Sequence, residues 1–295
     1  MSFLIRINCA VKPELESLVQ DAYLNNVRVV SDSPTNLRWN GDRVQLYQHS
    51  TSTRAVELEY QKQSLQLWVR AMSSTQDWHF AIALAQAVAR IVRSPVNLES
   101  IGVVEADHLP DHLHSDWIDA EQRSSARITL QLAATRGQIT LPGPIRHWSV
   151  GPRLTAQFQE LDESIRHERM IEQMKDLQWV HEIEACDPAT SLTTDEREPK
   201  FTLAVWVPDK RAIMPDVQYV VLNDGQSIIT LPHDRYLELA AGRFRFLDER
   251  TTLIEAFTAS ELPALYAAAR KWDETPRLAR SSRSNRPWWR IWTRS

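Results

Sequence analysis

Residues 74–92 read STQDWHFAIALAQAVARIV. The hydroxyl groups at the start of this stretch can cap a helix. Asp77 places an acid in the first turn, where its negative charge interacts favourably with the helix dipole. The large apolar side chains are separated by alanines and fall on nearly all sides of a helix. Such a pattern is typical of a helix surrounded by core. The stretch therefore predicts a central, buried helix.

Outward from this helix, the sequence alternates between strand and helix patterns without a strict βαβ order. Strands are expected at 3–7, 27–30, 37–39, 44–47, 56–60, 65–69, 201–207, 217–222, 228–231 and 243–247. Further helices are expected at 13–24, 115–136, 161–185, 236–241 and 260–272. These patterns predict an α+β fold with mixed or antiparallel sheets, packed helices and two lobes.

Composition divides the chain into three parts. Residues 187–200 are polar and contain Pro188 and Pro199, which is typical of a linker or loop. We expect an N-terminal α+β lobe with long helices at 1–190 and a smaller α+β lobe at 191–276. A basic, tryptophan-rich tail follows at 277–295.

The overall composition is that of a globular protein, with 43% hydrophobic and 24% charged residues. No apolar run approaches the roughly 18 to 20 residues that a membrane span needs. The N-terminal residues alternate like a strand and lack the pattern of a signal peptide. The two cysteines, Cys9 and Cys186, cannot form a disulfide framework, and both are expected to be structural thiols. A cytoplasmic location is predicted.

Glycine spacing excludes several classes of enzyme. The chain has 7 glycines, and none of them forms Gly-x-Gly. Loops that hold phosphates need closely spaced glycines, so the dinucleotide fingerprint and the P-loop are absent. The Gly-x-Ser-x-Gly elbow of hydrolases is absent as well. No cofactor is expected.

Histidines and acids gather at residues 107–116, DHLPDHLHSD. Imidazole and carboxylate suit zinc, which makes His108, His112 and His114 candidate ligands. Pro110 interrupts the helical spacing that a zinc pair would need, so the alternative is a solvated loop before a helix. The solvated loop is the favoured interpretation, and no metal is predicted.

Two other positions are candidates for ligand contact. Trp148 lies between two Gly-Pro turns and is a candidate for facing a ligand or partner, although most tryptophans are expected in the core. His233 and Asp234 follow Pro232 and can form half of a catalytic dyad. The alternative for this pair is an ordinary loop histidine beside a helix-entry acid. No catalytic residue is assigned.

The C-terminal tail differs in charge from the rest of the chain. Residues 277–295 contain six arginines, three tryptophans and no acid, whereas the formal net charge of the whole chain is −4. The first 276 residues therefore carry −10. Arginine beside tryptophan suits a protein groove, an anionic membrane surface or single-stranded nucleic acid. The candidate contact residues are Arg286, Trp288, Trp289, Arg290, Trp292 and Arg294.

One stretch resembles known sequences. Residues 137–144, GQITLPGP, followed by 149–154, SVGPRL, are similar to a stretch in uncharacterised bacterial proteins of the kind found near toxin and secretion loci. The resemblance is confined to these residues and brings no catalytic residue with it. It implies a protein that acts by interaction.

These observations predict a non-enzymatic bacterial protein that binds another protein. An immunity protein or an effector adaptor is the most concrete form, and an acidic body suits a cationic partner. The alternative is an enzyme or a small-molecule-binding protein with its site in a cleft between the lobes. The histidines at 108–114 or His233 would then contribute to the site.

Overall fold

The computed structural model describes residues 2–31, 33–179, 184–185, 188–190, 202–225 and 227–275. The chain divides into two compact units, Met1–Trp179 and Val180–Ser295. The predicted limit at residue 190 lies within the interval 180–201, of which only two short strands are described. Each unit is considered by itself.

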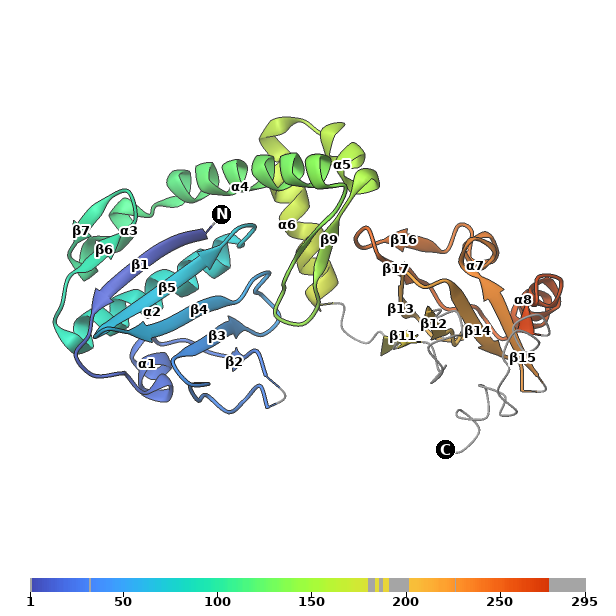
Figure 1. The fold of residues 1–295 in the computed structure, drawn as a ribbon, viewed down its shortest axis with the longest axis horizontal. Helices are drawn as coiled ribbons and strands as arrows, with labels where there is room; N and C mark the ends of the chain where they lie inside the picture. The colour runs from blue at the N-terminus through green and yellow to red at the C-terminus, as the bar shows by residue number, and fades with distance from the viewer. Residues whose placement is uncertain are drawn as a thin grey trace, which may run out of the picture. The chain divides into compact units, whose positions relative to one another are not determined.

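The first unit is built on a seven-stranded antiparallel sheet with the order β2-β3-β4-β5-β1-β6-β7. Its strands are β1 (Ser2–Asn8), β2 (Val27–Val29), β3 (Arg43–Gln48), β4 (Val56–Gln61), β5 (Ser64–Arg70), β6 (Val96–Leu98) and β7 (Gly102–Val104). The sheet is antiparallel throughout, and the long strands β1 and β5 pair along their whole length (Figure 1). Alternation then places every second side chain on the same face.

One face of this sheet forms the core of the unit with two helices. These are α1 (Leu15–Asp21) and α2 (Thr75–Val92), and α2 lies along the sheet in Figure 1. The residues that α2 buries include Trp78, Phe80, Leu84 and Val88, on more than one side of the helix. The predicted central helix is thus confirmed, with a capping box between Ser74 and Asp77.

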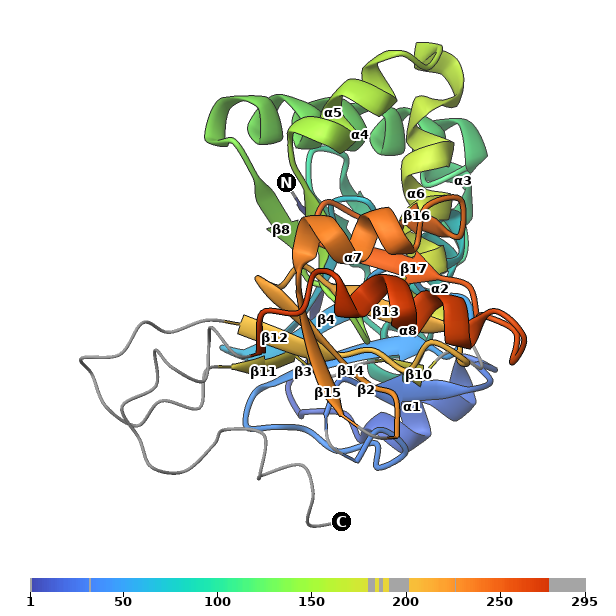
Figure 2. The ribbon, with the colours of Figure 1, turned by 90° about the vertical axis from the view of Figure 1, so that its right-hand side faces the viewer.

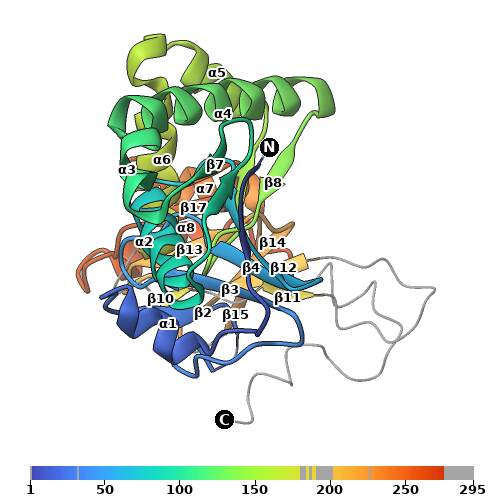
Figure 3. The same cartoon turned by 90° about the vertical axis from the view of Figure 1, so that its left-hand side faces the viewer.

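Beyond the sheet, the first unit continues as a helical layer (Figure 3). It contains a 3₁₀ turn (Ala106–His108), α3 (Leu109–His112), α4 (Ser115–Arg136), α5 (Pro152–Gln159) and α6 (Glu163–Trp179). Between α4 and α5 lies a two-stranded sheet of β8 (Ile139–Leu141) and β9 (Trp148–Val150). Gly137 ends α4 at φ 77°, a conformation that glycine adopts without strain.

The second unit contains two four-stranded sheets with the orders β10-β13-β17-β16 and β11-β12-β14-β15. Two helices, α7 and α8, pack with them (Figure 2). Trp206 and Tyr236 lie at the centre of its core, with ring centroids 5.2 Å apart. The elements are β10 (Glu184–Ala185), β11 (Pro188–Thr190), β12 (Thr202–Val205), β13 (Ala212–Pro215), β14 (Tyr219–Asn223), β15 (Ile228–Pro232), α7 (His233–Leu239), β16 (Phe244–Phe246), β17 (Thr251–Ile254) and α8 (Leu262–Arg270).

These elements confirm the predicted α+β fold with antiparallel and mixed sheets. Two local predictions were wrong: no strand forms at 37–39, and the predicted helix 161–185 begins at Glu163 and ends at Trp179. The elements that the patterns do not predict include β6, β7, β13, β17 and α5.

Candidate functional site

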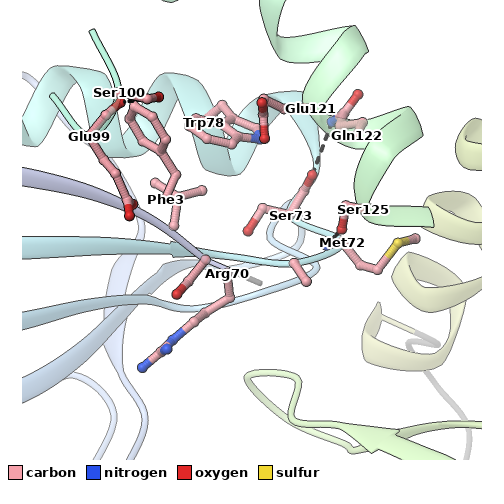
Figure 4. Close-up of a pocket in the computed structure, with 13 residues that line it drawn as sticks. Phe3, Arg70, Met72, Ser73, Trp78, Glu99, Ser100, Glu121, Gln122 and Ser125 are labelled. Carbon is pink, nitrogen blue, oxygen red and sulfur yellow. Dashed lines mark hydrogen bonds between the residues drawn. The ribbon is translucent and has the colours of Figure 1, made fainter. Parts of the chain in front are cut away.

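A pocket of about 260 Å³ opens in the first unit beside the N-terminus of α2 (Figure 4). Five segments of the chain form its walls: the start of β1, the end of β5 with the following loop, α2, the turn after β6, and α4. The lining residues include Phe3, Val69, Arg70, Met72, Ser73, Trp78, Glu99, Glu121, Gln122 and Ser125.

An aromatic cluster forms the apolar side of the pocket. Phe3 lies with its ring centroid 5.6 Å from that of Trp78, and both contact Trp117 at 5.0 and 5.2 Å. Phe3 is 8% exposed and Trp78 is 4% exposed. The rings therefore pack against one another and leave little of their surface for the pocket.

The loop between β5 and α2 is held in place by α4. The backbone N–H of Met72 donates to Ser125 Oγ at 2.8 Å, and Gln122 Nε2 donates to the carbonyl oxygen of Ser73 at 3.0 Å. Met72 has φ 63°, so this hydrogen bond fixes a backbone conformation that is uncommon for a residue with a Cβ. Ser73 is 2% exposed, and its Oγ has no hydrogen-bond partner in the described part of the chain.

Two carboxylates give the pocket its charge. Glu99 follows β6 and accepts a hydrogen bond from the backbone N–H of Leu4 at 3.0 Å. Glu121 projects from α4, and burial together with the charge of Glu99 raises the pKa of its carboxyl. No ion pair formed by the residues that the structure describes involves either carboxylate.

Arg70 also lines the pocket, but its guanidinium does not pair with these acids. Its guanidinium forms an ion pair with Glu57. Figure 4 shows the Arg70 side chain pointing away from the labelled pocket residues. The pocket therefore combines an apolar wall, a free hydroxyl and two acids, an arrangement that suits a cationic ligand.

The loop at the pocket is supported from behind by a buried aspartate. Asp77 is 0% exposed, and its Oδ2 accepts hydrogen bonds from the backbone N–H and hydroxyl of Thr53, from the N–H of Arg54, and from the N–H and hydroxyl of Ser74. The nearby guanidinium of Arg54 is also buried, and burial lowers its pKa to about 10. This network ties the N-terminus of α2 to the segment before β4.

Trp148 does not face an opening, so the prediction of a ligand-facing residue was wrong. Its side chain is 0% exposed and packs against Phe158, with the ring centroids 6.3 Å apart. The pairing of β8 with β9 fixes its strand, and the interior side of that strand is apolar. Burial of the large apolar indole of Trp148 stabilises the fold, whereas exposure of this side chain beside the two turns would not.

The predicted histidine cluster does not converge. His108 Nδ1 lies 3.0 Å from Asp111 Oδ2 in an exposed pair, while His112 and His114 are exposed on α3 and at the start of α4. No group of three or more His, Cys, Asp or Glu side chains in the described ranges can hold a metal ion.

His233 pairs with a different acid from the expected one. Its Nε2 lies 4.0 Å from Asp216 Oδ1, whereas Asp234 pairs with Arg235. A shallow hollow of about 510 Å³ in the second unit is lined by His233, Asp234 and Glu274, among others. A separation of 4.0 Å is too long for a hydrogen bond, so His233 and Asp216 do not form a hydrogen-bonded dyad.

The remaining predicted positions have different outcomes. Cys9 is buried, its thiol donates to the carbonyl oxygen of Val11 at 2.7 Å, and burial raises its pKa, which is typical of a structural thiol. Cys186 lies outside the described residues. The same is true of the tail candidates Arg286, Trp288, Trp289, Arg290, Trp292 and Arg294.

No sequence pattern marks the pocket residues as a site. Ser73, Glu99 and Glu121 come from three different segments, and none of them belongs to a motif. The helix pattern predicts Trp78 only as a core residue, and most of its side-chain surface is indeed buried.

Comparison with protein-family models, with curated proteins and with solved structures finds no match to this chain. Among the helices in the described ranges, none combines the length and the apolar character that crossing a bilayer requires.

Proposed function

We propose that this chain is a non-enzymatic cytoplasmic protein that acts by binding another protein of cationic character. An immunity protein or an effector adaptor of a bacterial toxin or secretion system is its most concrete form. That form rests on the resemblance of residues 137–154 and not on the site.

The observation that carries the proposal is the pocket of the first unit. It places Glu99 and Glu121 beside an apolar wall, and no described cation pairs with either of them. Carboxylates held near one another repel, and a cationic partner relieves this repulsion. The net charge of −10 on residues 1–276 also favours a cationic partner over the rest of this part of the chain.

Affinity capture from a lysate of the native host tests the proposal, using the full-length chain at about 0.05 and 0.5 M salt. We expect a stoichiometric protein with a net positive charge at low salt, and its loss at high salt. A partner that is acidic, or whose retention does not change with salt, would contradict the cationic character. Capture of no protein at either salt concentration would overturn the proposed function.

Two double variants locate the contact. Glu99→Gln with Glu121→Gln removes two charges from the pocket, and Glu16→Gln with Glu160→Gln removes two exposed charges elsewhere in the same unit. The pocket variant is expected to lose the partner, while the control variant retains it. Equal loss in both would place the attraction in the overall charge of the body.

A further inference from the structure

We propose that the pocket beside the N-terminus of α2 receives the primary ammonium group of a lysine side chain. This inference rests on the proposed function, because it assigns the lysine to the cationic partner protein. It names the chemistry that the pocket selects.

Three acceptor groups reach the pocket from three segments. Glu121 comes from α4, Glu99 from the turn after β6, and Ser73 Oγ from the loop between β5 and α2. An ammonium group has three donors and no acceptor, so it can engage acceptors that approach from different directions. A lone acidic cluster would be an ordinary solvated surface, but the hydroxyl of Ser73 distinguishes this site.

Among the residues that line the pocket, Ser73 carries a buried hydroxyl that the described part of the fold leaves without a hydrogen-bond partner. Its side chain is almost fully buried, its Oγ has no partner in the described ranges, and Figure 4 shows it directed between the aromatic side of the pocket and Arg70. Leaving a buried hydroxyl without a hydrogen-bond partner is energetically costly. A ligand donor that reaches Ser73 Oγ recovers that cost.

The shape of the pocket favours ammonium over guanidinium. Arginine binds best where its planar fork meets a single carboxylate bidentately, or where it stacks on an exposed ring face. Here Phe3 and Trp78 pack against each other at a tilt and against Trp117 edge to face, and they are only 8% and 4% exposed, so little ring surface is left for stacking. The two carboxylates come from different segments, so neither the stacking surface nor a planar pair is offered.

The apolar wall suits the stem of a lysine. Val69, Met72 and Phe3 line the pocket and are each largely buried. The methylene groups of lysine pack on such surface while the charged end reaches polar groups. A small inorganic cation would gain nothing from this wall.

Binding of Nα-acetyl-lysine N-methylamide to the full-length protein tests the inference. The readout is the indole N–H signal of Trp78 in a ¹⁵N-labelled sample, identified from the spectrum of Trp78→Phe. Trp78 lines the pocket, so its indole signal is sensitive to a new occupant. We expect a saturable shift of this signal.

Variants connect the shift to the acceptors. Glu121→Gln is expected to weaken binding about tenfold, and Ser73→Ala about fivefold. Glu160→Gln, an exposed acid outside the pocket, is expected to leave the affinity unchanged. Because Glu121 has no cationic partner in the described ranges, its neutralisation should not unfold the protein; a far-UV spectrum checks this. Unchanged binding in Glu121→Gln and Ser73→Ala would overturn the inference.

Other probes distinguish a lysine ammonium group from other cationic groups. The Nε-acetylated lysine derivative should not bind, and the corresponding arginine derivative should bind at least about threefold more weakly than lysine. Stronger binding of the arginine derivative would overturn the assignment to ammonium. Binding of spermidine more than about tenfold tighter than the lysine derivative would assign the pocket to a free polyamine and overturn the partner lysine.

The two proposals can fail separately. A captured basic protein combined with no shift of Trp78 by the lysine derivative would overturn the lysine pocket and leave protein binding intact. A saturable shift with no captured protein would overturn the proposed function and leave an ammonium site of another origin.

Discussion

At the scale of single residues, Asp77 has the most hydrogen bonds to lose. Asp77→Ala would leave donors of Thr53, Arg54 and Ser74 without an acceptor in the interior, and would remove a negative charge that acts on buried Arg54. We expect the free energy of unfolding to fall by about 3 kcal/mol, measured by urea denaturation. Burial itself raises the pKa of Asp77, so its carboxylate depends on these donors.

A matched change at the surface provides the control for Asp77. Asp107 forms an exposed ion pair with Arg90, and Asp107→Ala should cost less than about 1 kcal/mol. If Asp77→Ala cost no more than Asp107→Ala, the network at the start of α2 would not stabilise the fold.

His167 predicts a dependence of stability on pH. It is 2% exposed, its Nε2 lies 2.7 Å from Asp119 Oδ1, and burial lowers its pKa below the ordinary value of 6.5. Asp119 also pairs with Arg123, whose charge opposes protonation of the imidazole. Below about pH 6.5 the histidine of the unfolded chain binds a proton that folded His167 does not bind. The stability that neutral His167 contributes above this pH is therefore lost as the pH falls through the pKa of the folded state.

The measurement is the free energy of unfolding between pH 7.5 and pH 5 for the natural chain and for His167→Gln. The slope with pH should be smaller in the variant, because the substituted side chain does not titrate. Equal slopes would show that His167 has the same pKa in both states. His112→Gln, at an exposed position, serves as the comparison.

At the scale of elements, the turn between β8 and β9 is held by α6. Gln178 Oε1 accepts from the backbone N–H groups of Ile145 and Arg146 at 3.0 and 2.9 Å, and its Nε2 donates to the carbonyl oxygen of Arg146 at 2.7 Å. A Cβ on Gly143 would lie 2.3 Å from Gln178 Nε2 and 2.4 Å from the Arg146 carbonyl oxygen. This stretch includes the residues of the bacterial resemblance.

Gly143→Ala should therefore destabilise the first unit by about 1 to 3 kcal/mol through steric overlap. Gly41→Ala provides a contrast, because its Cβ would meet no atom within 4 Å and any cost there comes from φ of +59° alone. Thermal unfolding of both variants measures the difference. A Gly143→Ala protein as stable as the natural chain would mean that the turn shifts freely away from α6.

Two hairpin regions show how local signals mislead at this scale. Asn40 and Gly41 have the preferred turn sequence, yet only an isolated bridge between Asn40 and Arg43 forms there. Lys62 and Gln63 have no turn signal, and both adopt positive φ between β4 and β5. Because β4 and β5 pair in the central sheet, their register requires a tight turn at Lys62 and Gln63, although residues with a Cβ rarely adopt positive φ.

At the scale of the whole molecule, each unit has its own hydrophobic core. The first is centred on α2 and the seven-stranded sheet, and the second on Trp206 and Tyr236. We expect Asp77→Ala to increase amide hydrogen exchange in β4 and α2 while exchange in β14 and β15 stays unchanged. Equal acceleration in both sets would show that the two cores unfold as one cooperative unit.

The amino-acid sequence by itself determined the central helix, most of the strands and the α+β class. These follow from periodicity and capping, which depend on residues close together in the chain. Only the tertiary structure decided that Ser73, Glu99 and Glu121 share a pocket, that Trp148 is buried and that His233 pairs with Asp216. Pairings between distant segments are set by sheet register and helix packing, and no local pattern encodes which side chains they bring together.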